Sequence, residues 1–170
     1  MDETAPVHEL HLLRHAKSSW DEPGLPDHER PLAPRGRKAA RKLARYLHDE
    51  EIRPQLVLCS SAQRTRETLE RVRSSLGEPA VEFEDRLYGA GPDELLARLR
   101  EVPEAVESAL LIGHNPGIQE LALRLTPSDP RLAAKFPTGA LASFAVAERW
   151  KRLGEALVQL TAFVVPRELP

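Results

Sequence analysis

The chain has 170 residues, 41% of them hydrophobic, which is enough for one domain with an ordinary buried core. A formal charge of -2, from 24 Lys and Arg against 26 Asp and Glu, excludes a general attraction to nucleic acid or to an anionic membrane, so any anion site has to be local. A single cysteine, Cys59, excludes an internal disulfide framework, and no apolar run approaches the ~20 residues of a membrane helix. Residues 1–6 are polar and acidic, unlike a signal peptide, so we expect a cytoplasmic protein.

The first third of the chain predicts a strand, a stiff loop and a helix. The apolar run Val7–Leu13 is typical of a strand, and Arg14 and His15 follow it directly. Four prolines between residues 17 and 34 favour a polar loop rather than a regular element. A helix is expected to begin near Pro34, because apolar side chains recur on one helical face. These side chains are Ala39, Ala40, Leu43, Tyr46 and Leu47.

The middle of the chain predicts a second strand and two helices. Residues 55–59 form a compact apolar strand, and a helix over residues 62–75 is expected after it, capped by Ser60 or Ser61. Residues 81–83 predict a weak strand. Pro92 suits the first turn of a short helix that extends to Arg100.

The last third repeats the alternation of strand and helix. Residues 109–112 are fully apolar and predict a buried strand, which the tetrapeptide Gly113-His114-Asn115-Pro116 follows. A helix over residues 117–125 and a proline-broken loop over residues 126–137 come next. Two final strands, at residues 141–146 and 156–164, are expected to pair through a turn near Gly154.

This alternation predicts a single α/β domain over residues 1–170, built as a three-layer sandwich with a mostly parallel central sheet flanked by helices. Open α/β sheets bind ligands at the carboxyl ends of their strands. The loops after Leu13, Cys59 and Ile112 are therefore the places where a site is expected.

Each of these three loops holds residues suited to a phosphate. A guanidinium can donate two hydrogen bonds to two phosphate oxygens, and an imidazole can act as a nucleophile near neutral pH. Arg14 and His15 follow the first strand and His114 follows the strand at residues 109–112. Arg64 falls in the first turn of a predicted helix, where unpaired N–H groups favour an anion. Together the four residues predict a phosphate pocket.

These motifs resemble the histidine phosphatase superfamily, in the branch that includes the phosphoglycerate mutases, and are most similar to its SixA-like phosphohistidine phosphatases. The resemblance covers nearly the whole chain. It rests on residues 13–20, 30–32, 35–36, 60–68 and 113–116. In the family glycine more often follows the first arginine-histidine pair, whereas this chain has Ala16, a variant of the SixA-like group.

The resemblance implies that His15 attacks phosphorus and forms a phosphohistidine intermediate, while Arg14, Arg64 and His114 hold the phosphoryl oxygens. A hydrogen bond from the second nitrogen of His15 to a backbone carbonyl would fix its tautomer, and His114 is more useful as a donor, in a charged form. No metal or cofactor is expected, because the arginines and the histidine supply positive charge. A metal site at His8 and His11 is rejected, because strand alternation puts them on opposite faces.

The general acid is left unassigned. Many family members use a carboxylate after the third strand, and Glu82, Glu84 and Asp85 lie in about that region, although each is also typical of a solvated surface charge. A phosphoramidate such as phosphohistidine tolerates a weak or absent acid, because its leaving imidazole can already carry its proton. The short connections leave little room for a lid, and an open site would admit a protein side chain.

Further residues are candidates for substrate binding at the rim of the pocket. Lys17 and Arg30 lie on the first loop, Asn115 follows His114, and Thr138 precedes a late strand. Solvated loop charges are an equally good interpretation of Lys17 and Arg30. Trp20 is expected to pin the loop by packing.

Three functions remain open. The first is a phosphatase for phosphohistidine in proteins, and the second is a phosphomonoesterase for a small metabolite, which would require an acid and a closed pocket. The third, a non-catalytic phosphate-binding module, predicts loss of His15 or His114, and both are present. The expected partner is a phosphorylated protein or small phosphorylated substrate, not a nucleic acid or a membrane.

Overall fold

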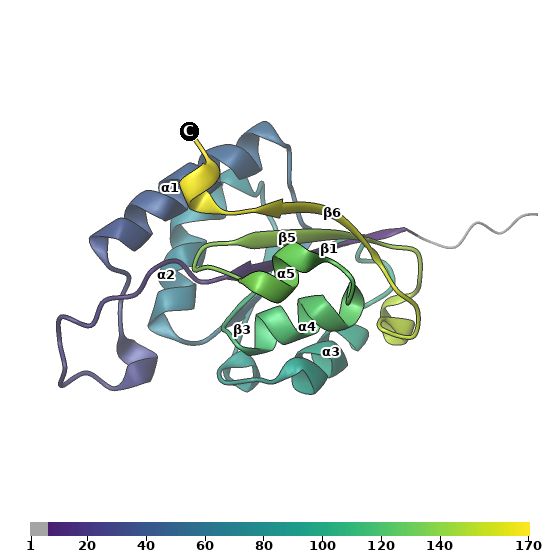
Figure 1. The fold of residues 1–170 in the computed structure, drawn as a ribbon, viewed down its shortest axis with the longest axis horizontal. Coiled ribbons are helices and arrows are strands. Elements are labelled where there is room, and N and C mark those ends of the chain that lie inside the picture. The colour runs from purple at the N-terminus through teal and green to yellow at the C-terminus, as the bar shows by residue number, and fades with distance from the viewer. Residues whose placement is uncertain (1–6) are drawn as a thin grey trace, which may run out of the picture.

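A computed structural model describes residues 7–170. The segment of residues 1–6, expected not to be a signal peptide, lies outside the described residues. Six strands form one sheet in the order β3-β2-β4-β1-β5-β6, seen edge-on among the helices in Figure 1. In chain order the strands are β1 His8–Arg14, β2 Leu56–Ser60, β3 Ala80–Glu84, β4 Ser108–Gly113, β5 Leu141–Val146 and β6 Gln159–Val164.

The four strands β3, β2, β4 and β1 are mutually parallel, and β5 and β6 extend the sheet in antiparallel fashion. β1 lies between β4 and β5, so its backbone is hydrogen-bonded on both edges. The carboxyl ends of β1, β2 and β4 consequently lie side by side at one edge of the sheet.

Helices cover both faces of the sheet (Figure 1). The helices are α1 Pro34–Asp49, α2 Gln63–Val72, α3 Pro92–Arg100, α4 Gly117–Leu125 and α5 Pro130–Ala134. Apolar residues of α1 and α2 belong to one buried cluster, and those of α3, α4 and α5 belong to the other. The predicted layered α/β fold is therefore confirmed.

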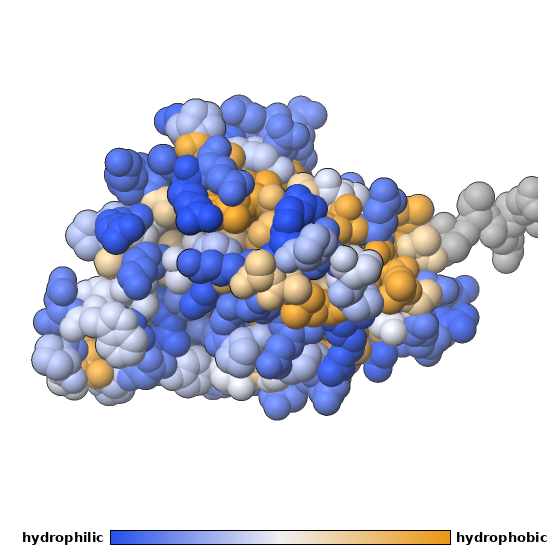
Figure 2. Space-filling view, in the orientation of Figure 1, coloured by the Kyte–Doolittle hydropathy of each residue, from blue (hydrophilic) through white to orange (hydrophobic). Residues whose placement is uncertain are grey.

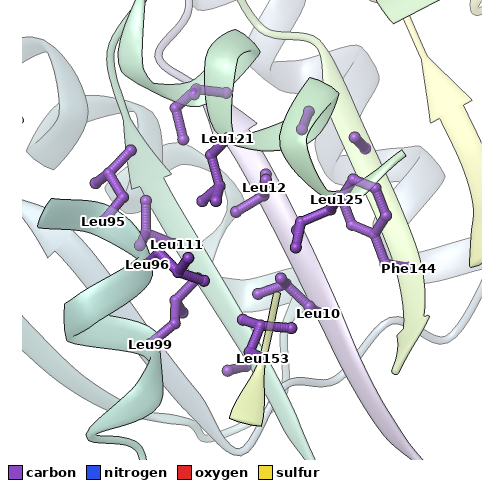
Figure 3. Packing of buried hydrophobic residues seen from close by; sticks show 14 of the residues in the cluster. Leu10, Leu12, Leu95, Leu96, Leu99, Leu111, Leu121, Leu125, Phe144 and Leu153 are labelled. Carbon is purple, nitrogen blue, oxygen red and sulfur yellow. The ribbon is translucent and has the colours of Figure 1, made fainter. Parts of the chain in front are cut away.

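Side chains of β1 alternate between the two faces of the sheet, so this strand contributes residues to both clusters. Leu10 and Leu12 pack with leucines of α3 and α4, as Figure 3 shows, while Leu13 joins the cluster under α1 and α2. All three side chains are fully buried. Burying a leucine stabilises a fold by about 1.5–3 kcal/mol, so β1 is held firmly up to the residue before Arg14.

The loop between β1 and α1 is closed at its base by an isolated bridge between Ser18 and Leu32. Its tip includes the short 3₁₀ turn Asp27–Glu29, which packs against α2. Gly36 allows the base of this loop to approach α1, because a Cβ at that position would lie only 2.1 Å from the carbonyl oxygen of Lys17.

Three local predictions need correction. The region predicted as a loop at residues 126–137 contains α5, because the side chain of Asp129 accepts hydrogen bonds from the N–H groups of Arg131 and Leu132. Neither Ser60 nor Ser61 caps α2, whose N-cap is Ala62. The last strand begins at Gln159 rather than at residue 156; its antiparallel pairing with β5 is confirmed.

The surface is mostly hydrophilic on the face drawn in Figure 2, with apolar areas near β6 and α5. Within residues 7–170, no helix has the length and apolar character needed to cross a membrane.

Candidate active site

The three strand ends bring the four predicted residues into one place. Arg14 is the last residue of β1, His114 directly follows β4, and Arg64 is in the first turn of α2 after β2. The N–H of His15 donates to the carbonyl of Gly113 at 3.1 Å, which fastens the end of β1 to the end of β4. Arg64 and His114 are each less than a tenth exposed.

His15 is held in one tautomer. Its Nδ1 lies 2.7 Å from the carbonyl oxygen of Ala16, which can only accept, so Nδ1 bears the hydrogen and Nε2 keeps its lone pair. Burial lowers the pKa of His15 to about 3, and the nearby His114, Arg64 and Arg14 act in the same direction. His15 is therefore neutral at neutral pH, as a nucleophile must be.

His114 is held in the opposite tautomer. The hydroxyl of Ser60 accepts the N–H of Ala62 at 3.3 Å and lies 2.8 Å from Nε2 of His114. Among the described residues Nε2 is the one acceptor within reach of the hydroxyl hydrogen, so we assign Ser60 as the donor to Nε2. Nδ1 of His114 then bears a hydrogen, and this buried atom has no protein partner. Burial and, after it, Arg64 lower the pKa of His114 to about 4. The expected charged form is thus wrong for the free protein, where a neutral ring still offers one donor.

Arg14 leaves a second donor unused. Its Nη1 donates to the carbonyl of Phe136 at 2.9 Å, while its Nε is buried without a partner. Burial and the charge of Arg64 lower the pKa of Arg14. Buried polar groups without partners are rare in native proteins, and two here belong to the same predicted pocket. An oxyanion bound between Nε of Arg14 and Nδ1 of His114 would accept a hydrogen bond from each. Its negative charge would also offset the repulsion between the guanidinium groups of Arg14 and Arg64.

Arg64 is oriented by a residue that the sequence analysis missed. Its Nη1 donates to the backbone oxygen of Asp27 at 2.8 Å, and its Nη2 donates to the Asp27 carboxylate at 3.1 Å. Arg30 and the hydroxyl of Tyr88 donate to the same carboxylate, at 2.9 and 2.5 Å. These donors, Tyr88 first, hold the pKa of Asp27 well below its usual range. The only signal in the sequence was the position of Asp27 three residues before Arg30, within the loop that carries two of the candidate substrate-binding residues.

The four candidate substrate-binding residues occupy different settings. Lys17 is exposed, and its carbonyl accepts the N–H of Ala33. Arg30 is buried, where it donates to Ser18, Ser19 and Asp27 and stacks on Trp20 at 3.2 Å from the ring centroid. Arg30 is therefore a loop anchor rather than a solvated charge. Trp20 is 70% exposed, so it contacts the loop through this stacking and not by being buried.

Asn115 and Thr138 lie beside the site through the backbone. Asn115 donates to the carbonyl of Phe136 at 3.2 Å, the same oxygen that Arg14 binds, and accepts the N–H of Gln119 at 3.3 Å. Thr138 is half-buried and precedes Gly139, whose N–H donates to the carbonyls of Arg14 and His15. Both residues thus belong to segments that fix the end of β1.

The three carboxylates considered for the general acid are not equivalent. Glu82 and Glu84 are both paired with Arg98 of α3, at 2.8 Å. Asp85 is exposed and begins the 3₁₀ turn that leads to Tyr88. Among the residues that the structure describes, the carboxylate that contacts predicted site residues is that of Asp27, which pairs with Arg30 and Arg64.

The histidines of β1 lie on opposite faces, as predicted. His8 packs against Trp150, and His11 hydrogen-bonds to the hydroxyl of Ser143 at 2.7 Å. Within the described part of the chain, no three His, Cys, Asp or Glu side chains lie close enough together to hold a metal ion.

A layered α/β fold with two arginines and two histidines at adjacent strand ends is typical of enzymes that bind a phosphoryl group. The chain belongs to the histidine phosphatase superfamily. The model of branch 1 of that superfamily matches residues 10–91. The family and the fold that the sequence motifs predicted are therefore confirmed.

Relatives extend the likeness over the rest of the chain. An uncharacterized protein of Mycobacterium leprae is 39% identical, over 91% of this chain and 100% of its own length. The structure of a candidate phosphohistidine phosphatase SixA from Nakamurella multipartitia is 30% identical with a TM-score of 0.86, over 96% of this chain and 99% of that one. A protein histidine phosphatase SixA complexed with tungstate is 25% identical with a TM-score of 0.79, over 94% and 97% of the two chains.

Proposed function

We propose that this protein hydrolyses the phosphoryl group of phosphohistidine in a protein, through a covalent intermediate on His15 and without a metal ion. The observation that supports it most is the pair of buried, unpartnered donors, Arg14 Nε and His114 Nδ1, in the pocket where His15 keeps its Nε2 lone pair. A donor set with a neutral nucleophile is what a transferring phosphoryl group requires.

The proposed reaction has two halves. Nε2 of His15 forms a bond to phosphorus while the bond to the leaving group breaks, and the electron pair departs with the leaving atom. Arg14, Arg64 and the Nδ1–H of His114 bind the phosphoryl oxygens, so the developing charge meets fixed donors. Water then attacks the phosphohistidine, which releases inorganic phosphate and restores the lone pair of His15.

The substrate class is inferred from two observations. Similar structures include a protein histidine phosphatase SixA with bound tungstate, an oxyanion that resembles phosphate in shape. In addition, Glu82 and Glu84 are committed to Arg98, so they are poor candidates for protonating an alcohol leaving group. A phosphoramidate has less need of such an acid.

The test compares rates on a phosphohistidine-bearing protein with rates on a panel of sugar and aryl phosphates. We expect the highest kcat/KM on phosphohistidine and no dependence on added chelator. The His15→Ala variant should release no phosphate from any of them, and brief incubation of wild-type protein with labelled substrate should give an acid-labile label on the chain. A strong preference for sugar phosphates would assign the protein to small-molecule phosphomonoesters instead, and full activity of His15→Ala would exclude the covalent route.

A further inference from the structure

One carboxylate lies at the phosphate pocket without a part in the reaction described so far. Asp27 contacts Arg64 through both its backbone oxygen and its side chain, so it is one guanidinium group away from the phosphoryl site. Its side chain is 49% exposed, which leaves it accessible to a bound substrate. No other carboxylate among the described residues is within 4 Å of Arg64.

The structure holds this carboxylate as a fixed anion. Arg30 donates to Oδ1, and Arg64 and Tyr88 both donate to Oδ2. An ionised carboxylate has about four acceptor positions, so three donors leave one position open, on Oδ1. The pKa of Asp27 lies well below its usual range, so the group accepts hydrogen bonds and does not deliver a proton.

The surroundings of Asp27 are rigid enough for recognition. Arg30 is itself fixed by the hydroxyl of Ser18, the carbonyl of Ser19 and the ring of Trp20. The ring of Tyr88 packs edge-on against His114, with centroids 5.5 Å apart. The carboxylate of Asp27 is therefore positioned relative to Arg64, which it contacts directly, and to His114, through the ring of Tyr88.

A fixed anion at this place suits one kind of leaving group. An imidazole leaves phosphorus easily only when its second ring nitrogen is protonated, because it can then depart as a neutral molecule. An alcohol would instead need a proton donor, which an ionised carboxylate is not. A carboxylate close to the second nitrogen raises the pKa of the imidazole and keeps its proton in place.

We propose that Asp27 is a specificity-determining residue, whose carboxylate accepts a hydrogen bond from the second ring nitrogen of the leaving imidazole and so favours phosphohistidine over phosphate esters. This inference rests on the proposed function. In the step, the bond from phosphorus to the leaving nitrogen breaks as Nε2 of His15 bonds to phosphorus. The electron pair stays on the leaving nitrogen, and the imidazole departs neutral with the proton that faces Asp27. Asp27 itself remains ionised throughout.

The experiment measures kcat and kcat/KM of wild type and Asp27→Asn on a phosphohistidine peptide and on p-nitrophenyl phosphate, whose leaving group needs no proton. Both rates should fall in the variant, because Arg64 loses an ionic partner. The ratio of the phosphohistidine rate to the ester rate should fall roughly tenfold further, the size of one hydrogen bond to a charged group. The alkaline limb of kcat on phosphohistidine should also move to lower pH, by about one unit.

Two control variants separate this role from simpler ones. Glu29→Gln removes an exposed negative charge two residues away and should leave both rates unchanged. Tyr88→Phe removes a hydrogen-bond donor to Asp27 but leaves the charge of Asp27 in place. The ratio of the phosphohistidine rate to the ester rate should therefore change less than threefold.

Three outcomes would contradict the proposal. Equal losses on both substrates in Asp27→Asn, with no shift of the pH limb, would make Asp27 a structural support for Arg64. A gain on both substrates would mean that Asp27 blocks the pocket. Wild-type protein that hydrolyses the ester and not the phosphohistidine peptide would instead overturn the proposed function, and this result is read before any variant is compared.

Discussion

The imidazole rings of His15 and His114 lie 5.3 Å apart between centroids, with their planes tilted by 54°. Each ring has one nitrogen bound to a neighbour, the first to the carbonyl of Ala16 and the second to the hydroxyl of Ser60. These bonds assign opposite tautomers to two adjacent neutral rings. One ring thereby offers a lone pair and the other a hydrogen, which a phosphoryl group needs from two sides at once.

The hydroxyl of Ser60 should matter for catalysis because it contacts the ring of His114. In Ser60→Ala the Nε2 of His114 loses its donor, so the ring can adopt the other tautomer and Nδ1 no longer bears a hydrogen. We expect kcat to fall about tenfold with a smaller change in KM, since one hydrogen bond is lost. Steady-state kinetics on p-nitrophenyl phosphate measures this. Ser61→Ala is the matched control, because the hydroxyl of Ser61 binds His28 and not His114; equal effects of the two variants would refute the tautomer argument.

Replacement of Arg14 by lysine should lower activity although the positive charge is kept. A lysine keeps the charge but not the planar set of donors, so it cannot use Nη1 for Phe136 and Nε for a phosphoryl oxygen together. Loss of a positioned donor at developing charge costs about 10²–10³ in rate. We expect Arg14→Lys to lower kcat/KM by about a hundredfold, and Arg35→Lys, at an exposed position of α1, to have no measurable effect. Retention of activity within threefold in Arg14→Lys would show that Nε is not used.

The two neutral histidines should make the fold less stable in weak acid. The pKa values of His15 and His114 are lowered to about 3 and about 4, so the unfolded chain takes up protons near pH 6.5 that the folded protein refuses. Above pH 6.5 the two histidines are neutral in both states and the free energy of unfolding is at its full value. As the pH falls below 6.5 the unfolded state is protonated first, so the free energy of unfolding decreases. Linkage gives a loss of about 2 kcal/mol per histidine between pH 7 and pH 5.

Urea unfolding at pH 7 and pH 5 measures this loss of stability. In His15→Gln the difference in the free energy of unfolding between the two pH values should be smaller by about 2 kcal/mol, the contribution of one histidine. The exposed His48 provides the control, because its replacement by Gln removes a group with 71% of its side chain in solvent. An unchanged pH dependence in His15→Gln would mean that the ring of His15 titrates normally.

Gly36 should be sensitive to a single methyl group. An added Cβ would meet the carbonyl oxygen of Lys17, and that carbonyl also accepts the N–H of Ala33 at the base of the first loop. Gly36→Ala therefore has to move the segment that follows His15, and overpacking of this kind costs about 1–3 kcal/mol. We expect a lower midpoint of urea unfolding together with lower kcat. Gly24→Ala, where the added Cβ meets nothing within 4 Å, should leave both unchanged, and equal behaviour of the two variants would contradict the close approach.

The sequence was sufficient to predict the sheet and to place Arg14, His15, Arg64 and His114 at adjacent strand ends, because both follow from local pattern. Apolar runs such as residues 109–112 are buried on both faces, and polar residues at their ends lie at one edge of a parallel sheet. The tautomer of His15 was also predictable, since its partner is the carbonyl of the next residue.

What the sequence did not reveal depends on contacts between distant segments. Asp27 meets Tyr88 across 61 positions, and Ser60 meets His114 across 54. The serine was expected to cap α2, a local role, and instead binds an imidazole on the neighbouring strand end. Arg30 was weighed as a solvated charge because the sequence does not show that the loop folds back so that Ser18, Trp20 and Asp27 enclose it.

The bridge between Ser18 and Leu32 closes a loop whose tip carries both Asp27, which contacts Arg64, and the exposed segment before it. Residues 21–26 lie between the stack on Trp20 and the carboxylate of Asp27, and their side chains are largely in solvent. The side chains of residues 21–25 can therefore change without removing the contacts that Asp27 makes with Arg64 and Arg30. The surface that this part of the loop presents can thus vary in sequence while Asp27, Arg30 and Arg64 keep their positions.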